Sequence, residues 1–173
     1  PNIIYIMTDD LGYGDLSGYG RKDYATPILD KLAGQGIKFV NAYSAAPVCT
    51  PTRTAFMTGR YPARIPVGLK EPLVKSREDS AVGLTAEHPS VATLMKNAGY
   101  ETALIGKWHL GWDWTTKNGM PPVDNKQECN VDYSMKVTGG PTAIGFDYFF
   151  GMDAPNYPPY TYIENDKIKG TPS

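Results

Sequence analysis

The sequence predicts an α/β fold whose candidate functional residues follow the ends of strands. Residues 2–8 form an uninterrupted apolar run, which is typical of a strand buried on both faces. Two helix patterns, over residues 27–35 and 91–98, are each followed by another strand-like run, over residues 37–43 and 100–106. Because open α/β sheets bind ligands beyond the carboxyl ends of their strands, the polar residues that follow such runs are the candidates for function.

The composition limits the class of protein before any motif is considered. With 173 residues, 41% of them hydrophobic, the chain is long enough for one core and has the composition of an ordinary globular protein. Its 17 basic and 18 acidic residues, without a basic run, argue against a general nucleic-acid-binding protein. No apolar stretch approaches the roughly 18 residues of a membrane span, and we expect no signal peptide within these residues. The two cysteines, Cys49 and Cys129, do not fix the redox compartment.

The first strand-like run ends in two adjacent carboxylates, Asp9 and Asp10. Adjacent like charges are costly to bury without a cation, so a hard divalent metal bound through oxygen atoms is their natural partner. A solvated turn is the alternative that these residues alone leave open. Asp15, in the same loop, is expected to have a structural role.

The next element is a helix that begins after Thr26. Thr26 suits the N-cap position, and Pro27 suits the first helical position, where a missing N–H removes no hydrogen bond. Apolar residues recur along one face of the segment, and Gly34 or Gly36 can end it. The strand-like run over residues 37–43 would then carry the chain to the second helix.

The segment over residues 47–59 places a cysteine at the start of that second helix. Pro51 fits the first turn, and Gly59 can end the helix in left-handed backbone. Cys49 then lies at or just before the helix start, where unpaired N–H groups and the helix dipole favour an anion. Arg53, four residues on, lies on the same face and leans back toward Cys49. The segment predicts a sulfur nucleophile, or a group made from it, beside an anion receptor; a buried thiol beside a surface arginine is the alternative.

A second polar pair follows the strand-like run over residues 100–106. Ser90 suits the N-cap of the helix before this run, and Gly99 can close that helix. Lys107 and His109 are two residues apart, so in an extended segment their side chains would point the same way. An ammonium and an imidazole aimed together suit an anionic substrate and proton transfer, whereas two surface residues are the alternative.

The remaining segments are rich in loops. Prolines punctuate residues 60–87, and we expect the charged run over residues 75–79 to be solvated. Beyond Gly111 the sequence is irregular. Residues 145–166 are rich in aromatic residues, and aromatic core with an edge strand is one interpretation of them.

Several of these segments resemble the sulfatase family. Residues 49–53 (CTPTR), followed by residues 56–59 (FMTG), look like the first sulfatase signature, although Thr52 stands where serine or alanine is commoner. Residues 99–111 look like the second signature, and residues 2–19 look like the amino-terminal strand and loop of the family. Residues 145–166 resemble a segment of bacterial sulfatases, many of which act on carbohydrates.

The resemblance implies a specific chemistry for Cys49. In the sulfatase family this cysteine is oxidised to formylglycine by a formylglycine-generating enzyme before folding, and the hydrate of the aldehyde is the nucleophile. Asp9 and Asp10 would bind calcium, with residue 49 as a further ligand. Arg53 and Lys107 would offset the charge of the transferring group. His109 would transfer a proton as sulfate is expelled.

The resemblance also implies the fold, substrate and surroundings of the protein. It implies an alkaline-phosphatase-like domain with a mixed, mostly parallel sheet flanked by helices, of which residues 1–173 are expected to be the incomplete amino-terminal part. The rest, with further metal ligands and a further sulfate-binding lysine and histidine, is expected in sequence absent here, so that this part alone would be inactive. The implied activity is hydrolysis of carbohydrate or aryl sulfates, in the periplasm or outside the cell. A phosphatase or phosphonate hydrolase of the same superfamily, and a non-catalytic binding fragment with unmodified Cys49, are the alternatives.

Overall fold

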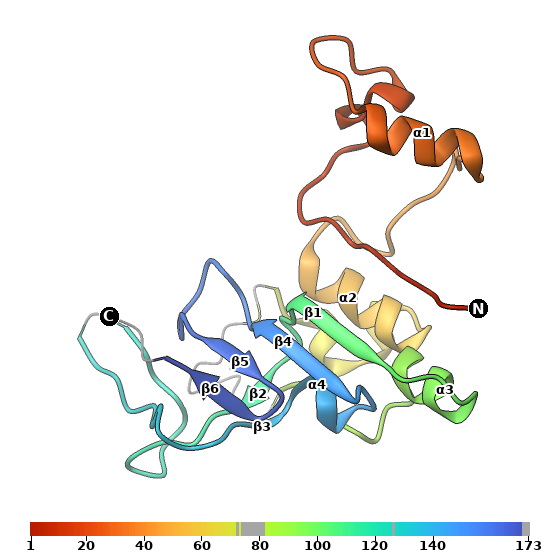
Figure 1. The fold of residues 1–173 in the computed structure, drawn as a ribbon. Coiled ribbons are helices and arrows are strands. Elements are labelled where there is room, and N and C mark those ends of the chain that lie inside the picture. Colours follow the sequence, from red (N-terminus) through yellow and green to blue (C-terminus); the bar gives the residue numbers. More distant parts are fainter. Residues whose placement is uncertain (72, 74–81, 126, 171–173) are drawn as a thin grey trace. The chain divides into compact units, whose positions relative to one another are not determined.

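The computed structural model describes residues 1–71, 73, 82–125 and 127–170, which belong to two compact units, residues 1–43 and 44–173 (Figure 1). The charged run predicted over residues 75–79 lies outside the described residues. No helix among the described residues is long and apolar enough to cross a membrane.

The amino-terminal unit, residues 1–43, is built around helix α1, Pro27–Gln35. The helix begins at Pro27, as predicted, and ends at Gln35 with Gly36, one of the two predicted stop residues, at the C-cap. Two 3₁₀ turns precede it, η1 over Tyr13–Asp15 and η2 over Ser17–Tyr19. Asp30 accepts hydrogen bonds from the Ser17 hydroxyl (2.5 Å) and the Thr26 hydroxyl (3.1 Å), which tie the second turn to the helix. Asp15 accepts the Gly12 amide at 2.7 Å, and its structural role is confirmed.

The two strands predicted for this unit, over residues 2–8 and 37–43, do not form. Ile4 and Ile6 are 86% and 79% exposed, and Ile37 is 81% exposed. Apolar and β-branched composition gives a segment the propensity for a strand, but a strand exists only where a neighbour satisfies its backbone groups. Neither run has such a ladder among the described residues, so both predictions are wrong for this structure.

The helices of the carboxyl-terminal unit, residues 44–173, follow their predicted ends closely. Helix α2 spans Cys49–Thr58, and the left-handed Gly59 (φ 65°) donates its amide to the Ala55 carbonyl at 2.8 Å. Helix α3 spans Val91–Asn97, and the Ser90 hydroxyl caps it by accepting the Thr93 amide at 3.1 Å. The shorter helical elements are η3 (Pro62–Arg64), η4 (Pro66–Leu69) and α4 (Gly140–Ala143).

A mixed sheet with the order β1-β4-β5-β6 forms the centre of this unit (Figure 1). Strands β1 (Ala103–Lys107) and β4 (Tyr148–Met152) are parallel. Strands β5 (Tyr162–Glu164) and β6 (Lys167–Lys169) continue the sheet with antiparallel pairings. A second, two-stranded sheet pairs β2 (Trp112–Asp113) with β3 (Thr138–Gly139). The predicted α/β class, with a mixed sheet and flanking helices, is confirmed, but β1 begins three residues later than the predicted strand and includes Lys107.

The segment that leaves β1 is anchored by burial. Trp108, Leu110 and Trp112 are each at most 1% exposed and belong to one apolar core with Phe149 and Ile163 of the sheet. The Trp108 amide donates to the Met152 carbonyl at 2.9 Å, which extends the contact between β1 and β4. The loop after β1 is therefore held in place by its buried side chains.

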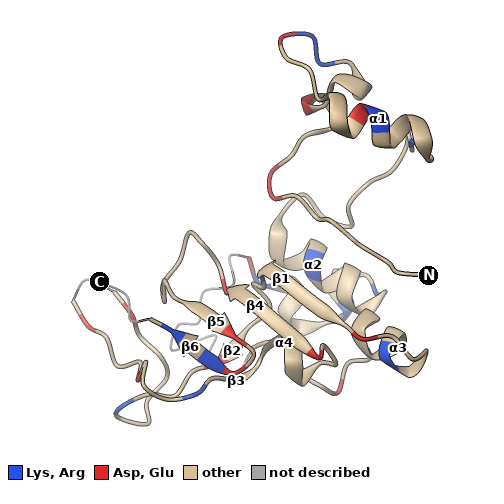
Figure 2. Cartoon of the chain, viewed as in Figure 1, with Lys and Arg blue, Asp and Glu red and all other residues tan. Residues whose placement is uncertain are grey.

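At the other edge of the sheet, basic residues of β6 lie beside an acidic residue of β5 (Figure 2), and Lys169 pairs with Glu164 at 2.5 Å.

Strands β1 and β4 meet through two glycines in register, Gly106 and Gly151. A Cβ atom on Gly151 would lie 1.9 Å from the Gly106 carbonyl oxygen, so no larger residue fits without moving the backbone. We expect Gly151→Ala to lower the free energy of unfolding by about 1–3 kcal/mol, as overpacking does elsewhere. Chemical denaturation measures this loss. Gly34→Ala is the matched control, since its Cβ would meet no heavy atom within 4 Å; equal stability losses in the two variants would contradict the prediction.

Candidate active site

The site is built on the first turn of α2, which presents Cys49 as its first residue. Val48 occupies the N-cap position and has no side-chain oxygen to satisfy the amides of the first turn. Pro51 contributes no amide, and Thr50 is fully buried. Cys49 is partly exposed, whereas the next residue of its helix, Thr50, is buried.

His109 faces the sulfur from the loop after β1. Its Nδ1 atom lies 3.4 Å from Cys49 Sγ, and its Nε2 atom lies 3.2 Å from the Leu73 carbonyl oxygen. A carbonyl oxygen only accepts, so Nε2 carries the proton, and Nδ1 of the neutral ring is an acceptor directed at residue 49. Burial holds the pKa of His109 below its usual value, and the nearby Lys107 ammonium adds to this effect, while Glu71 opposes it. The ring is therefore held in its neutral form, with the acceptor atom Nδ1 directed at Cys49 Sγ.

The imidazole reaches this position through strained backbone. His109 is fully buried and has a positive φ of 54°, which non-glycine residues seldom adopt. The prediction that Lys107 and His109 share a direction assumed an extended segment. That assumption is wrong, because a left-handed residue interrupts the two-residue alternation of a strand. The charge of Lys107 nevertheless acts on His109.

Arg53 links α2 to the end of β1. Its Nη1 atom donates to the Lys107 carbonyl oxygen at 2.8 Å, and its side chain is half-buried. This contact crosses from the helix that carries Cys49 to the strand that leads to His109. Arg53 thus fixes the spacing of the two elements and brings a permanent positive charge to the site.

Glu71 is part of the site, and the sequence did not indicate it. Its Oε2 atom accepts the Thr50 amide at 2.8 Å and so caps α2 from a distant loop. Its Oε1 and Oε2 atoms lie 3.6 and 3.8 Å from Cys49 Sγ. The predicted anion receptor at the start of α2 therefore holds a carboxylate of the chain itself.

Tyr157 is a second residue that the sequence did not single out. Its half-buried ring is roughly parallel to the His109 ring, at 28°, with 6.2 Å between the centroids. It comes from the loop between β4 and β5. The aromatic segment over residues 145–166 thus contributes to the surroundings of the imidazole as well as to the sheet.

The structure brings together Cys49, Arg53, Lys107 and His109 in the carboxyl-terminal unit. Asp9 and Asp10 belong to the amino-terminal unit, where both are exposed and Asp10 has a positive φ of 57°. Two adjacent carboxylates match the preference of calcium for hard oxygen donors, but calcium takes roughly 6–8 ligands. No group of three or more His, Cys, Asp or Glu side chains among the described residues is arranged to hold a metal. Two carboxylates fit calcium in donor chemistry, and they would supply only part of such a shell.

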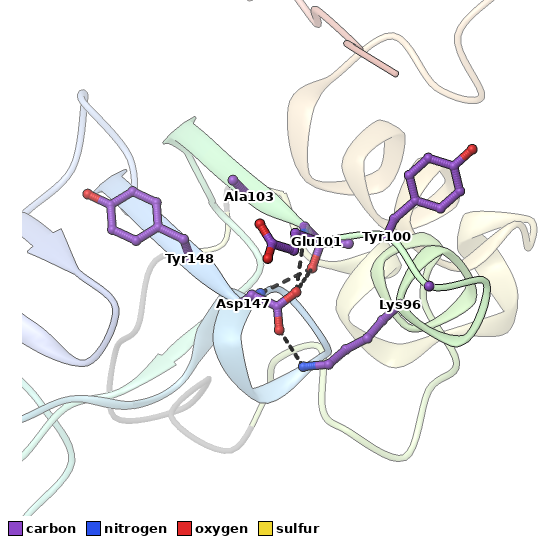
Figure 3. A pocket seen from close by; sticks show the side chains of 8 residues that line it. Lys96, Tyr100, Glu101, Ala103, Asp147 and Tyr148 are labelled. Atoms are coloured by element: carbon purple, nitrogen blue, oxygen red, sulfur yellow. Dashed lines mark hydrogen bonds and ion pairs between the residues drawn. The ribbon is translucent and has the colours of Figure 1, made fainter. Parts of the chain in front are cut away.

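A separate pocket of about 700 Å³ lies at the opposite ends of the same strands (Figure 3). It opens where β1 and β4 begin, whereas Lys107 and His109 lie at and beyond the end of β1. Asp147 lies inside it and is bound by the Lys96 ammonium and by the amide and hydroxyl of Thr102, as the dashed lines show. These contacts hold the pKa of Asp147 at about 2, with the Lys96 hydrogen bond as the largest cause. Its polar groups are engaged in joining α3 to the sheet, so this pocket is not the candidate active site.

Comparison with known proteins agrees with the geometry. The family model described as Sulfatase matches residues 1–170. The chain is 38% identical over 171 residues to an N-acetylgalactosamine-6-O-sulfatase of Bacteroides thetaiotaomicron, covering 98% of this chain and 30% of that protein. It is 41% identical over 157 residues to human steryl-sulfatase, covering 90% of this chain and 24% of that protein.

A solved structure supports the same assignment. It belongs to work on glycosaminoglycan metabolism by Bacteroides thetaiotaomicron and superposes with a TM-score of 0.79 and 36% sequence identity. The match covers 98% of this chain and 32% of that one, so the chain spans about a third or less of the length of these relatives. The family model nevertheless covers nearly every residue of the chain. The chain belongs to the sulfatase family.

Proposed function

We propose that the protein to which this chain belongs hydrolyses sulfate esters of carbohydrates or aryl alcohols, with formylglycine derived from Cys49 as its nucleophile. The observation that carries the proposal is the position of Cys49, at the start of α2 with its sulfur 3.4 Å from an acceptor nitrogen of buried His109. Membership of the sulfatase family implies a formylglycine and metal mechanism in general. The relatives are named for an amino sugar and a steroid, so they support sulfate esters as a class.

The residues of the chain have separable roles in this proposal. Formylglycine, once formed, supplies a hydrate whose one hydroxyl attacks sulfur while the other allows sulfate to be expelled. His109 Nδ1, at the position that faces residue 49, accepts a proton from that residue. Arg53 and Lys107 provide positive charge that offsets the charge on the transferring group. Tyr157, whose ring is roughly parallel to the imidazole, forms part of the surroundings of His109.

The proposal includes calcium held by Asp9 and Asp10, with residue 49 and residues outside this chain completing the shell. Calcium would supply a Lewis acid to the anionic substrate. The support is the donor chemistry of two adjacent carboxylates after an apolar run and the family's use of a metal.

Replacing both aspartates by asparagine, Asp9→Asn with Asp10→Asn, is expected to weaken calcium binding by about 10-fold or more, because charge is lost while size is kept. Calcium titration followed by thermal unfolding measures this in the whole protein. Asp23→Asn, another exposed aspartate of the same unit, is the matched control. Unchanged calcium stabilisation in the double variant would remove the metal role from these residues.

The proposed activity is tested on the whole protein, produced with a formylglycine-generating enzyme. Matched aryl sulfate and aryl phosphate esters are assayed side by side, and we expect hydrolysis of the sulfate ester to dominate. Cys49→Ala should abolish turnover, whereas Cys129→Ala, at the other and exposed cysteine, should not. Preference for the phosphate ester would support the phosphatase alternative, and full turnover by Cys49→Ala would overturn the proposed nucleophile. We also propose a periplasmic or secreted location, which cell fractionation tests.

A further inference from the structure

Glu71 places a negative charge beside the position where the proposed reaction takes place. Both of its carboxylate oxygens lie within 4 Å of Cys49 Sγ, at 3.6 and 3.8 Å. The Thr50 amide, 2.8 Å from Oε2, holds the carboxylate there. This hydrogen bond is charge-assisted and lies at the positive end of the α2 dipole, so the contact is favourable for the folded chain.

The consequence is a site of mixed charge. Arg53 and Lys107 are cations whose charges act on His109, the residue that faces Cys49, and Glu71 is a carboxylate that contacts the Cys49 side chain. An anionic substrate bound there is attracted by the two cations and repelled by the carboxylate. The repulsion grows with each negative charge on the substrate, since Coulomb energy is proportional to the product of the charges.

Sulfate and phosphate esters differ in that charge. A sulfate monoester carries one negative charge, whereas a phosphate monoester has a second pKa of about 6 and is a dianion above neutral pH. At about 4 Å, the repulsion between two unit charges corresponds to about a fivefold change in a binding or rate ratio in water and to a larger change near a protein surface. Glu71 is exposed, so the effect of one additional charge belongs at the lower end of this range.

We propose that Glu71 is a specificity-determining residue that disfavours dianionic phosphate esters relative to monoanionic sulfate esters at the residue 49 site. This inference rests on the proposed function and names what restricts it to sulfate. It assigns to Glu71 a role in discrimination and leaves bond cleavage to residue 49 and His109.

The test is the ratio of kcat/KM for an aryl phosphate to kcat/KM for the matched aryl sulfate, measured near pH 8 on the whole protein. Glu71→Gln removes the charge and keeps an oxygen that can accept the Thr50 amide. We expect the ratio to rise about 5- to 10-fold, since about 1.4 kcal/mol corresponds to tenfold. Glu71→Asp keeps the charge, so the ratio should stay near that of the parent even if both rates fall. A merely structural role would lower both rates together and leave the ratio unchanged.

Controls separate a local from a general effect of charge. Glu101→Gln makes the same change of net charge at an exposed residue of the pocket at the opposite end of β1, and should leave the ratio unchanged. Binding of phenyl phosphate and phenyl sulfate to the Cys49→Ala protein, measured by calorimetry with and without Glu71→Gln, gives a readout independent of turnover. If Glu71→Gln leaves the ratio unchanged, or if Glu101→Gln raises it equally, the inference about Glu71 is overturned. The proposed function still stands in that case, provided that the parent protein hydrolyses the sulfate ester. A parent that prefers the phosphate ester overturns both.

Discussion

Replacing His109 by glutamine is expected to lower kcat for an aryl sulfate by about 100- to 10,000-fold, the range that general acid–base groups contribute. Glutamine can keep the amide donor that reaches the Leu73 carbonyl in place of Nε2, but it has no acceptor at the Nδ1 position. The loss should therefore be in proton transfer at residue 49, where Nδ1 now lies 3.4 Å from Sγ. Steady-state kinetics on the whole protein measure it.

The control for this prediction is His88, the other of the two histidines in the chain. His88 lies in a loop near the Thr85 hydroxyl, 3.3 Å from its Nδ1 atom. His88→Gln should leave kcat within about twofold of the parent, as surface substitutions usually change little. Because His109 is buried, both variants are also compared by thermal unfolding. A folded His109→Gln protein with parental kcat would show that His109 does not transfer the proton.

Replacing Arg53 by lysine is expected to lower kcat/KM by about 100-fold, even though the charge is kept. Arg53 donates from Nη1 to the Lys107 carbonyl at 2.8 Å, and a guanidinium group presents its donors in a planar fork that matches the geometry of an oxyanion. An ammonium group is a point charge on a flexible stem and cannot hold the carbonyl and the anion in the same geometry. Loss of a donor aimed at developing charge costs about 10²–10³ in other enzymes.

Arg60→Lys is the matched control for Arg53→Lys, because Arg60 is exposed just beyond the end of α2. It should retain the kcat/KM of the parent. If Arg53→Lys turned over aryl sulfate as fast as Arg60→Lys, the proposed role of the guanidinium group would be wrong.

The helices could be predicted from the sequence because their ends are encoded locally. Pro27, Ser90 and Gly59 mark helix ends through properties of their own backbone and side chains, and the structure has these ends where expected. The strands over residues 2–8 and 37–43 failed because a strand depends on a partner that local sequence does not name. The strand at 103–107 does have such a partner, β4, and it forms.

The residues of the candidate site also divide into those that local sequence indicates and those that depend on distant contacts. Spacing within a helix indicated that Cys49 and Arg53 share a face. The position of Lys107 and His109 after a strand-like run indicated a pair suited to an anionic substrate, and the resemblance gave both residues specific roles. Glu71 was missed because it reaches Cys49 from 22 residues away, through a proline-rich loop without periodicity. The positive φ of His109 was also missed; it lies between the buried residues Trp108 and Leu110, and no local motif in the sequence marks it. Long-range contacts, rather than motifs, complete the site.

The mass of the peptide that carries residue 49, isolated from active protein made in its native host, tests most directly whether Cys49 is the precursor of the nucleophile. Conversion to formylglycine exchanges the sulfur for a carbonyl oxygen, and the aldehyde can be captured by a hydrazide probe. The proposed function predicts that the converted peptide dominates and that its fraction tracks aryl sulfate turnover across preparations. Full turnover by protein whose residue 49 is an unmodified thiol would contradict it.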